Sequence, residues 1–338
     1  MALYSGIDLH SNNNWLVVLD GPEKVVKSVK QPNDLATVIG ALEPFRDDLE
    51  GVAVESTWNW YWLVDGLMAE GFPVRLTNTS AVKQYEGLKY SSDEHDARWL
   101  AHLLALGILP EGYIYPKEDR PVRDLLRRRM FLVEKRTSML LAMRGAFECR
   151  TGSRVNVNEL KSWTAEDVMA RIEDPLAAQS IACLLEPVHA LTREVAGLEA
   201  LARAQARRRP EHQRLQTVWG IGRTLSLVIL YEVGEISRFP SVGDFASYCR
   251  LVKSGRFSNG KRKGAGNPKN GNPYLSWAFH EAAHHAVRHY PAARLYVQKK
   301  RAKTNGIVAI RALAHKLARA TYHVLRDNVA FEPDKLFR

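Results

Sequence analysis

The chain has 338 residues, of which 46% are hydrophobic and 25% charged, which is typical of a globular protein of two or three domains. No apolar run is long enough to span a bilayer, and the N-terminus lacks the pattern of a signal peptide, so we expect a cytoplasmic protein without membrane contact. Three widely separated cysteines without a CxxC pair argue against a disulfide framework or a structural zinc site.

Charge is distributed unevenly along the chain. Residues 1–118 contain 9 Lys/Arg and 17 Asp/Glu, a net charge of −8, and residues 119–249 contain 20 and 16, a net charge of +4. Residues 250–338 contain 19 Lys/Arg and 4 Asp/Glu, a net charge of +15. The basic C-terminal third indicates binding to nucleic acid or another anionic surface. The acidic N-terminal third is unusual for a simple DNA-coating protein and suggests carboxylates that bind metal ions.

The N-terminal third is predicted to begin with a three-strand meander, followed by alternating helices and strands. The predicted segments are Tyr4–Asp8, Asn14–Asp20, Lys24–Lys30, Asn33–Phe45, Gly51–Ser56, Trp58–Glu70, Pro73–Thr77, Ser80–Glu86 and Asp93–Leu106. This is the element order of the ribonuclease-H-like fold, an α/β arrangement with a mixed sheet.

Four carboxylates occupy informative places on that scaffold. Asp8 ends the first strand, Glu55 ends the fourth, and Asp93 and Asp96 share one face at the start of a helix. Taken singly, Asp93 and Asp96 are explained as helix N-terminal acids and Asp8 as a turn residue. Together, the four favour a site for Mg²⁺, with Mn²⁺ as the other suitable ion, of the kind that assists phosphodiester displacement.

The middle of the chain is predicted to be helical. One long helix covers residues 117–150 and a second covers Pro187–Arg209, with short helices at Val155–Leu160 and Ala165–Glu173 between them. Helices of this length outside a compact domain often form a coiled coil. Pairing within one chain, dimerisation, and arginine faces that contact a nucleic-acid backbone all remain open.

The C-terminal part begins with a glycine turn, TVWGIG at residues 217–222, before an apolar helix at Leu225–Val233. Gly220 and Gly222 suit a helix-hairpin-helix element whose backbone amides bind phosphate, and a tight helix–helix turn explains them equally well. Three further helices are predicted at Val242–Leu251, Pro273–Arg288 and Ile307–Arg326.

A glycine-rich basic loop is predicted at Lys253–Asn272, with five glycines, six Lys/Arg and no acid. Glycine lets a polyanion approach the backbone, and the cations neutralise phosphates. The cations chosen as candidate nucleic-acid contacts are Arg256, Lys261, Arg262, Lys263 and Lys269. The loop also holds Ser254 and Ser258, and a serine among arginines and amides suits phosphoryl transfer through a covalent intermediate. The loop alone is explained more simply by nucleic-acid binding.

A formal HExxH zinc-protease motif occurs at His280–His284. We reject this interpretation because the flanking helix is alanine-rich and no third ligand follows at metzincin spacing. These histidines are predicted to line a helix face near phosphates.

The motifs together resemble those of the Piv/MooV-like recombinases, transposases of bacterial insertion sequences in the IS110/IS1111 group. GIDLH, AVES and DEHDA resemble the DEDD motif of this group, through Asp8, Glu55, Asp93 and Asp96. TVWGIG, ISRFPSVGDFASYCRL and FSNGKRKGAGNPKNGNPYLSWAF resemble its C-terminal transposase domain. The resemblance covers nearly the whole chain.

The resemblance implies a RuvC-like domain at 1–116, a helical or coiled-coil region at 117–212 and a C-terminal transposase domain at 213–338. The DEDD residues would bind Mg²⁺, and the family's nucleophilic serine falls on Ser258, with Ser254 as the alternative. That serine would form a covalent phosphoserine link to DNA. A structured non-coding RNA would pair with donor and target DNA. Two or four protomers would bring the acidic domain of one chain against the serine of another.

Together with the residues, this resemblance implies an RNA-guided DNA recombinase of the bacterial cytoplasm that is nucleoid-associated when active. In it, the metal ion would either activate Ser258 or stabilise the transition state, and Arg256, Lys261 and Arg262 would neutralise the phosphate. One alternative is a metal-dependent junction endonuclease that forms no covalent intermediate. A second is a non-catalytic nucleic-acid-binding protein.

Overall fold

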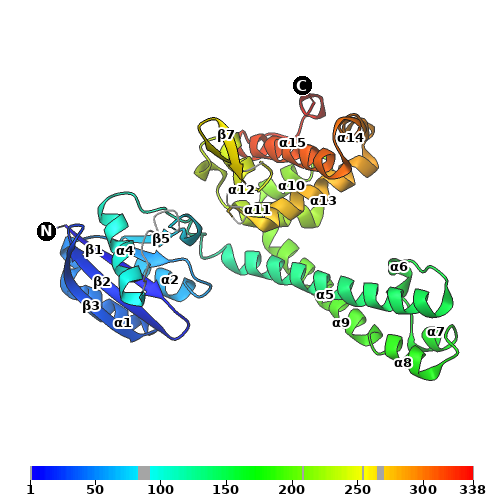
Figure 1. Ribbon diagram of the computed structural model, residues 1–338, viewed down its shortest axis with the longest axis horizontal. Helices are drawn as coiled ribbons and strands as arrows, with labels where there is room; N and C mark the ends of the chain where they lie inside the picture. Colours follow the sequence, from blue (N-terminus) through cyan, green and yellow to red (C-terminus); the bar gives the residue numbers. More distant parts are fainter. Residues whose placement is uncertain (1, 83–91, 208, 253–254, 265–269, 338) are drawn as a thin grey trace. The chain divides into compact units, whose positions relative to one another are not determined.

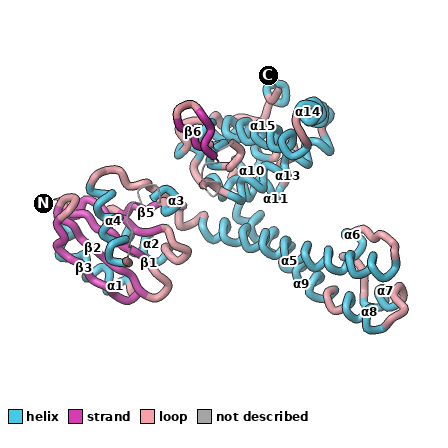
Figure 2. The backbone as a smooth tube through the Cα atoms, in the orientation of Figure 1, coloured by secondary structure: helices cyan, strands magenta, loops and turns pink. Residues whose placement is uncertain are grey.

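The computed structural model describes residues 2–82, 92–207, 209–252, 255–264 and 270–337. They form two compact units, Met1–Lys117 and Glu118–Arg338 (Figures 1 and 2). In these described ranges, no helix combines the length and the apolar character that crossing a membrane requires.

A five-stranded sheet forms the centre of the first unit. Its strands are β1 (Leu3–Leu9), β2 (Asn13–Asp20), β3 (Lys24–Pro32), β4 (Leu49–Glu55) and β5 (Val74–Thr77). Their order in the sheet is β3-β2-β1-β4-β5. The β1–β2 and β2–β3 pairs are antiparallel, whereas β1–β4 and β4–β5 are parallel. The predicted mixed sheet is confirmed, and the carboxyl ends of β1 and β4 lie side by side.

Helices cover both faces of this sheet. The helices of this unit are α1 (Leu35–Leu42), α2 (Tyr61–Ala69), α3 (Thr79–Val82) and α4 (Asp93–Ala105), of which α1, α2 and α4 pack on the sheet. Helices α1 and α2 share a core with Ile7 and Val18, whereas α4 packs on the opposite face, where Val17 lies. Neighbouring residues of a strand point to opposite faces, which explains how β2 serves both cores. Of the helix predicted at Ser80–Glu86, positions 83–86 lie outside the described residues.

Gly6 determines how closely α4 approaches β1. A Cβ atom at this position would overlap the carbonyl oxygen of Ala97 and lie 2.7 Å from the backbone nitrogen of Ala101. Only a residue without a side chain therefore allows α4 to rest directly on the strand. This contact fixes the first turn of α4 near the end of β1.

The second unit begins with two long helices, α5 (Arg120–Thr151) and α9 (Leu185–Ala206), that lie side by side and antiparallel (Figure 1). Arg129 forms an ion pair with Glu199 at 2.7 Å, and Arg136 donates to Thr192 at 3.3 Å. Three short helices join them, namely α6 (Val157–Leu160), α7 (Ala165–Met169) and α8 (Pro175–Ala182). Both predicted long helices are confirmed, and they pair within one chain.

The remainder of this unit is mainly helical. Its helices are α10 (Pro210–Leu215), α11 (Arg223–Val233), α12 (Val242–Tyr248), α13 (Pro273–His289), α14 (Pro291–Lys303) and α15 (Gly306–Arg326). Helix α11 is central, since every side chain from Leu225 to Val233 is buried. The start of α5 contributes Val122 and Leu126 to the same core. Short 3-10 helices occur in this unit at Ile236–Arg238 and Pro333–Lys335, and in the first unit at Glu43–Asp48.

The segment predicted as one loop at 253–272 contains an antiparallel hairpin, so that prediction is corrected. Its strands are β6 (Arg256–Ser258) and β7 (Lys261–Gly264). The turn residues Asn259 and Gly260 have φ angles of 48° and 70°. An Asn-Gly pair in left-handed conformation is the favoured two-residue hairpin turn, which explains why this glycine-rich, basic sequence forms strands.

Candidate metal centre and serine hairpin

Parallel pairing places Asp8 and Glu55 at one edge of the sheet. Ile7 of β1 lies opposite Val54 of β4, so the next residue of each strand reaches the same edge. Asp93 and Asp96 occupy the first turn of α4, whose N-cap is Ser92. The structure thus brings together the carboxylates that the sequence singled out.

Three side chains converge most closely at this edge. Asp8 is buried, with 4% of its surface exposed. The Nε2 atom of His10 lies 3.1 Å from Oδ2 of Asp8 and 3.2 Å from Oδ1 of Asp93. One ligand atom from each of these residues lies within 4.8 Å of the others. In the described part of the chain, this is the one group of three or more His, Cys, Asp or Glu residues that converges in this way.

The carboxylates influence each other's protonation. Burial raises the pKa of Asp8, while a hydrogen bond with Glu55 and the charge of His10 act in the opposite direction. The pKa of Glu55 is raised to about 8, first by burial and then by the hydrogen bond with Asp8 and the charges of Asp8 and Asp96. At neutral pH these effects favour the protonated form of Glu55, hydrogen-bonded to Asp8.

The donor set fits a divalent cation. Carboxylate oxygens suit Mg²⁺ and Mn²⁺, and imidazole suits transition-metal ions. Asp8, His10 and Asp93 supply the converging atoms, and the side chain of Glu55 is hydrogen-bonded to that of Asp8. A cation among them would also favour the ionised forms of the buried Asp8 and Glu55 carboxyl groups.

His10 was not among the residues chosen from the sequence. Its backbone carbonyl accepts hydrogen bonds from Nδ2 of Asn33 and Nδ2 of Asn59, both at 2.9 Å. The signal available in the sequence is the spacing of two from Asp8, because residues two apart on an extended chain share a face. That spacing does not reveal the two asparagines, which lie after other strands.

The predicted nucleophile Ser258 is exposed and ends strand β6, where it pairs with Lys261 across the turn. Lys261 and Lys263 are exposed on β7. Arg256 and Arg262 belong to the two strands through their backbones. The alternative nucleophile Ser254 and the predicted phosphate contact Lys269 lie outside the described residues.

Both ends of the basic segment are anchored by hydrogen bonds. Arg311 of α15 donates to the carbonyls of Arg250 and Val252 at 2.9 and 3.3 Å, just before the segment. Arg250 donates to the carbonyl of Gly271 at 3.0 Å, and Asn272 donates to Glu232 at 2.7 Å. The residues that flank the hairpin in sequence, Arg250, Val252, Gly271 and Asn272, are therefore held in place.

Glu232, the acceptor of the hydrogen bond from Asn272, is a buried carboxylate that also binds two arginines. Arg127 forms two bonds with it, at 2.5 and 2.8 Å, and Arg123 a third at 3.3 Å. Burial alone would raise the pKa of Glu232, but Arg127, Arg123 and Asn272 outweigh burial and lower it. Charged at neutral pH, Glu232 ties α5 and α11 to the start of α13.

The two predicted glycines differ in their surroundings. Gly220 has a φ of 79°, and a Cβ there would overlap the carbonyl oxygen of Ala282 in α13, so close helix packing explains it. Gly222 is the N-cap of α11, and a Cβ there would meet nothing within 4 Å. Phosphate binding by either residue stays a prediction. In the HExxH segment, His280 bonds to the carbonyl of Ser276 at 2.7 Å.

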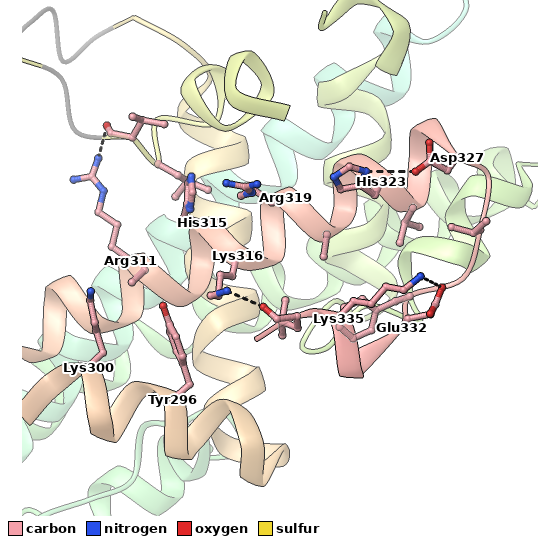
Figure 3. A pocket seen from close by; sticks show the side chains of 18 of the residues that line it. Tyr296, Lys300, Arg311, His315, Lys316, Arg319, His323, Asp327, Glu332 and Lys335 are labelled. Carbon is pink, nitrogen blue, oxygen red and sulfur yellow. Dashed lines mark hydrogen bonds and ion pairs between the residues drawn. The ribbon is translucent and has the colours of Figure 1, made fainter. Parts of the chain in front are cut away.

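A pocket of about 960 Å³ lies along α15, between α14 and the C-terminal segment (Figure 3). Its charged lining consists of Lys300, Arg311, Lys316, Arg319 and Lys335 with Asp327 and Glu332. Glu332 is paired with Lys335 at 2.8 Å. The pKa of His315 in its wall is lowered first by burial and then by the charges of Arg319 and Lys316. The sequence did not reveal this pocket, because it depends on how α14, α15 and the C-terminal segment pack.

Comparison with known proteins finds similarity in both units. Residues 5–148 match a family model of DEDD transposases of the IS110 type, and residues 212–298 match the family described as Transposase IS116/IS110/IS902. The chain is 26% identical over 296 residues to a probable family 20 transposase of Pseudomonas aeruginosa, covering 83% of this chain and 86% of that protein. It is 24% identical over 236 residues to the transposase for insertion sequence element IS1111A of Coxiella burnetii, covering 68% and 63%.

Proposed function

Because this chain belongs to the IS110/IS1111 family of transposases, enzymes that cleave and join DNA, we propose that it recombines DNA through covalent attack by Ser258, directed by a guide RNA. The observation that carries the proposal is an exposed Ser258 on an anchored, wholly basic segment, in a chain that also holds an acidic centre. We further propose donor and target DNA as substrates and a dimer or tetramer as the active form.

The proposed architecture is a ribonuclease-H-like, RuvC-like first unit at 1–116, a coiled coil within 117–212 and a transposase domain at 213–338. The element order and mixed sheet support the first assignment. For the second, the pairs Arg129–Glu199 and Arg136–Thr192 lie seven residues apart on each helix, which is the repeat of coiled-coil packing.

In the proposed reaction, the Oγ atom of Ser258 forms a bond to a DNA phosphorus while the bond from that phosphorus to one deoxyribose oxygen breaks. The serine proton passes to a base, and the released oxygen takes up a proton. Lys261 and Lys263, exposed beside the turn, reduce the repulsion between the phosphate and the approaching oxygen. A bound Mg²⁺ or Mn²⁺, held by Asp8, Glu55, Asp93 and Asp96, would stabilise developing negative charge.

Trapping of a protein–DNA adduct tests the chemistry. Wild-type protein, its guide RNA and labelled DNA carrying the element ends should yield an adduct that survives denaturing electrophoresis. Ser258→Ala and Asp8→Asn should abolish it, whereas Ser254→Ala, the matched serine control in the same segment, should retain it. Adducts that persist in Ser258→Ala and vanish in Ser254→Ala would move the nucleophile. Cleavage without any adduct would favour the junction-endonuclease alternative.

Recovery of bound RNA tests the guide. The protein is purified from cells that also transcribe the non-coding flank of its element, and the bound RNA is sequenced. We expect one structured species with segments complementary to donor and target DNA, and altering a target-complementary segment should redirect recombination. Recombination that proceeds equally well after ribonuclease treatment would contradict RNA guidance.

A further inference from the structure

We propose that His10 is a ligand of the metal ion in the acidic centre, and that its nitrogen gives the centre a preference for Mn²⁺ over Mg²⁺. The inference rests on the proposed function for the presence of an ion. It adds a residue outside the four carboxylates and a metal selectivity that those carboxylates alone do not imply.

The position of the imidazole supports ligation. Its Nε2 atom lies 3.1 Å from an oxygen of Asp8 and 3.2 Å from an oxygen of Asp93, which come from β1 and α4. Neighbouring ligands of an octahedral ion with bonds of about 2.1 Å lie about 3 Å apart. The single N–H on Nε2 cannot point at both oxygens at once. A hydrogen bond shared between them would therefore have poor angles and would be weak. A cation among the three atoms would contact all of them.

The backbone of His10 is held in place by two other segments. Nδ2 of Asn33, just after β3, and Nδ2 of Asn59, just after β4, both donate to its carbonyl at 2.9 Å. These two bonds hold the backbone from which the ring extends. The side chain of His10 is nevertheless 43% exposed, so an ion can reach the ring from solvent.

The chemistry of the donor set determines the selectivity. Mg²⁺ is bound by oxygen ligands and retains several waters, whereas imidazole nitrogen suits transition-metal ions. A set of two carboxylates and one imidazole therefore favours Mn²⁺ more than a set of carboxylates alone. His10→Gln places a neutral oxygen near the position of Nε2 without changing the charge. This variant should reduce the preference while retaining a donor.

Pulsed electron paramagnetic resonance on Mn²⁺ tests ligation directly. The probe is Mn²⁺ alone, added to the full-length, tag-free protein after chelator treatment. Wild type should show ¹⁴N modulation from a coordinated imidazole, and His10→Gln should lose it. Calorimetric titrations should show the ratio of Mn²⁺ to Mg²⁺ affinity falling roughly tenfold or more in His10→Gln. His95→Gln, a histidine replaced between Asp93 and Asp96 outside the converging group, is the matched control and should retain both properties.

The outcomes separate this inference from the proposed function. Mn²⁺ that binds in an Asp8-dependent manner without ¹⁴N modulation would overturn ligation by His10 and leave the recombinase proposal intact. An unchanged affinity ratio in His10→Gln would overturn the selectivity. Mn²⁺ binding that Asp8→Asn leaves unaltered would instead contradict the metal centre itself. A wild-type spectrum without ¹⁴N modulation would overturn ligation by His10 even where a variant folds poorly.

Discussion

Glu55 carries the largest change in acidity among the residues of the acidic centre. Its pKa rises from an ordinary value of 4.5 to about 8 in the folded protein, because of burial and then of Asp8. Between these values, the folded protein holds a proton that the unfolded chain has lost. The stability that this proton contributes is fully present below pH 4.5 and is lost as the pH rises through about 8.

Glu55→Gln should remove this pH dependence, because glutamine stays neutral at every pH. In chelator, the Tm of the variant relative to wild type should increase by roughly 2–4 °C between pH 5 and pH 9. Differential scanning calorimetry measures the difference. Glu50→Gln, at an exposed position near the start of the same strand, is the matched control and should follow the wild-type profile. A Tm difference that is the same at both pH values would contradict the assignment.

The four carboxylates were accessible from the sequence because each marks the end of a strand or the start of a helix. His10 was not, since a histidine after a strand is common and its partners Asn33 and Asn59 are distant in sequence. Hydrogen bonds between loops depend on the final packing, and residue spacing carries little trace of them.

At the scale of elements, the contact of α4 with β1 positions Asp93 relative to Asp8. Gly6→Ala should force the helix away, because the added Cβ would overlap the carbonyl of Ala97. We expect a loss of about 1–3 kcal/mol in the free energy of unfolding and weaker Mn²⁺ binding. Urea unfolding and metal titration measure the two effects. Gly40→Ala, where a Cβ meets nothing within 4 Å, is the control and should not destabilise. Full Mn²⁺ affinity in Gly6→Ala would contradict this role of α4.

The anchorage of the basic segment gives a second prediction at this scale. Asn272→Ala removes the bond to Glu232 and the N-cap of α13, at a cost of about 1–3 kcal/mol. DNA adduct formation should fall as well, because the base of the hairpin is loosened. Ser241→Ala removes the N-cap of α12, outside the segment, at a cost of about 1 kcal/mol. It should leave adduct formation unchanged. Equal losses of adduct in both variants would indicate a general stability effect.

The hairpin shows where local sequence patterns were insufficient. Its strands contain Arg, Lys and Gly rather than β-branched residues, and they lack the alternation that predicts a strand. The Asn259-Gly260 turn was the signal available. The long helices α5 and α9 were predictable because their apolar residues repeat at helical spacing over many turns. Their pairing within the chain required the structure.

At the scale of the whole molecule, the net charge of +15 in residues 250–338 gathers partly around the α15 pocket. The exposed side chains of Lys300 and Arg319 lie there without a hydrogen bond or ion pair among the described residues. We expect them to contact a nucleic-acid backbone. The Lys300→Ala/Arg319→Ala double variant should weaken binding of a fluorescent DNA duplex and reduce the slope of log affinity against log salt by about 2.

Lys299→Ala is the control for that measurement. Lys299 is exposed on α14, the helix that carries Lys300, but it does not line the pocket. It should change the slope less than either pocket substitution. An unchanged slope in the double variant would show that the pocket is not a DNA-binding surface. Charge asymmetry along the chain was predictable from composition, whereas the pocket itself depends on how α14, α15 and the C-terminal segment pack.

Peptide mapping of the trapped adduct tests the central claim most directly. Trypsin cleaves after Lys253, Arg256 and Lys261, so the two candidate serines fall in separate peptides, Ser254–Arg256 and Phe257–Lys261. Mass spectrometry after nuclease digestion should find a nucleotide on Phe257–Lys261, joined through Ser258. A nucleotide on Ser254–Arg256, or recombination without any nucleotide-bearing peptide, would contradict attack by Ser258.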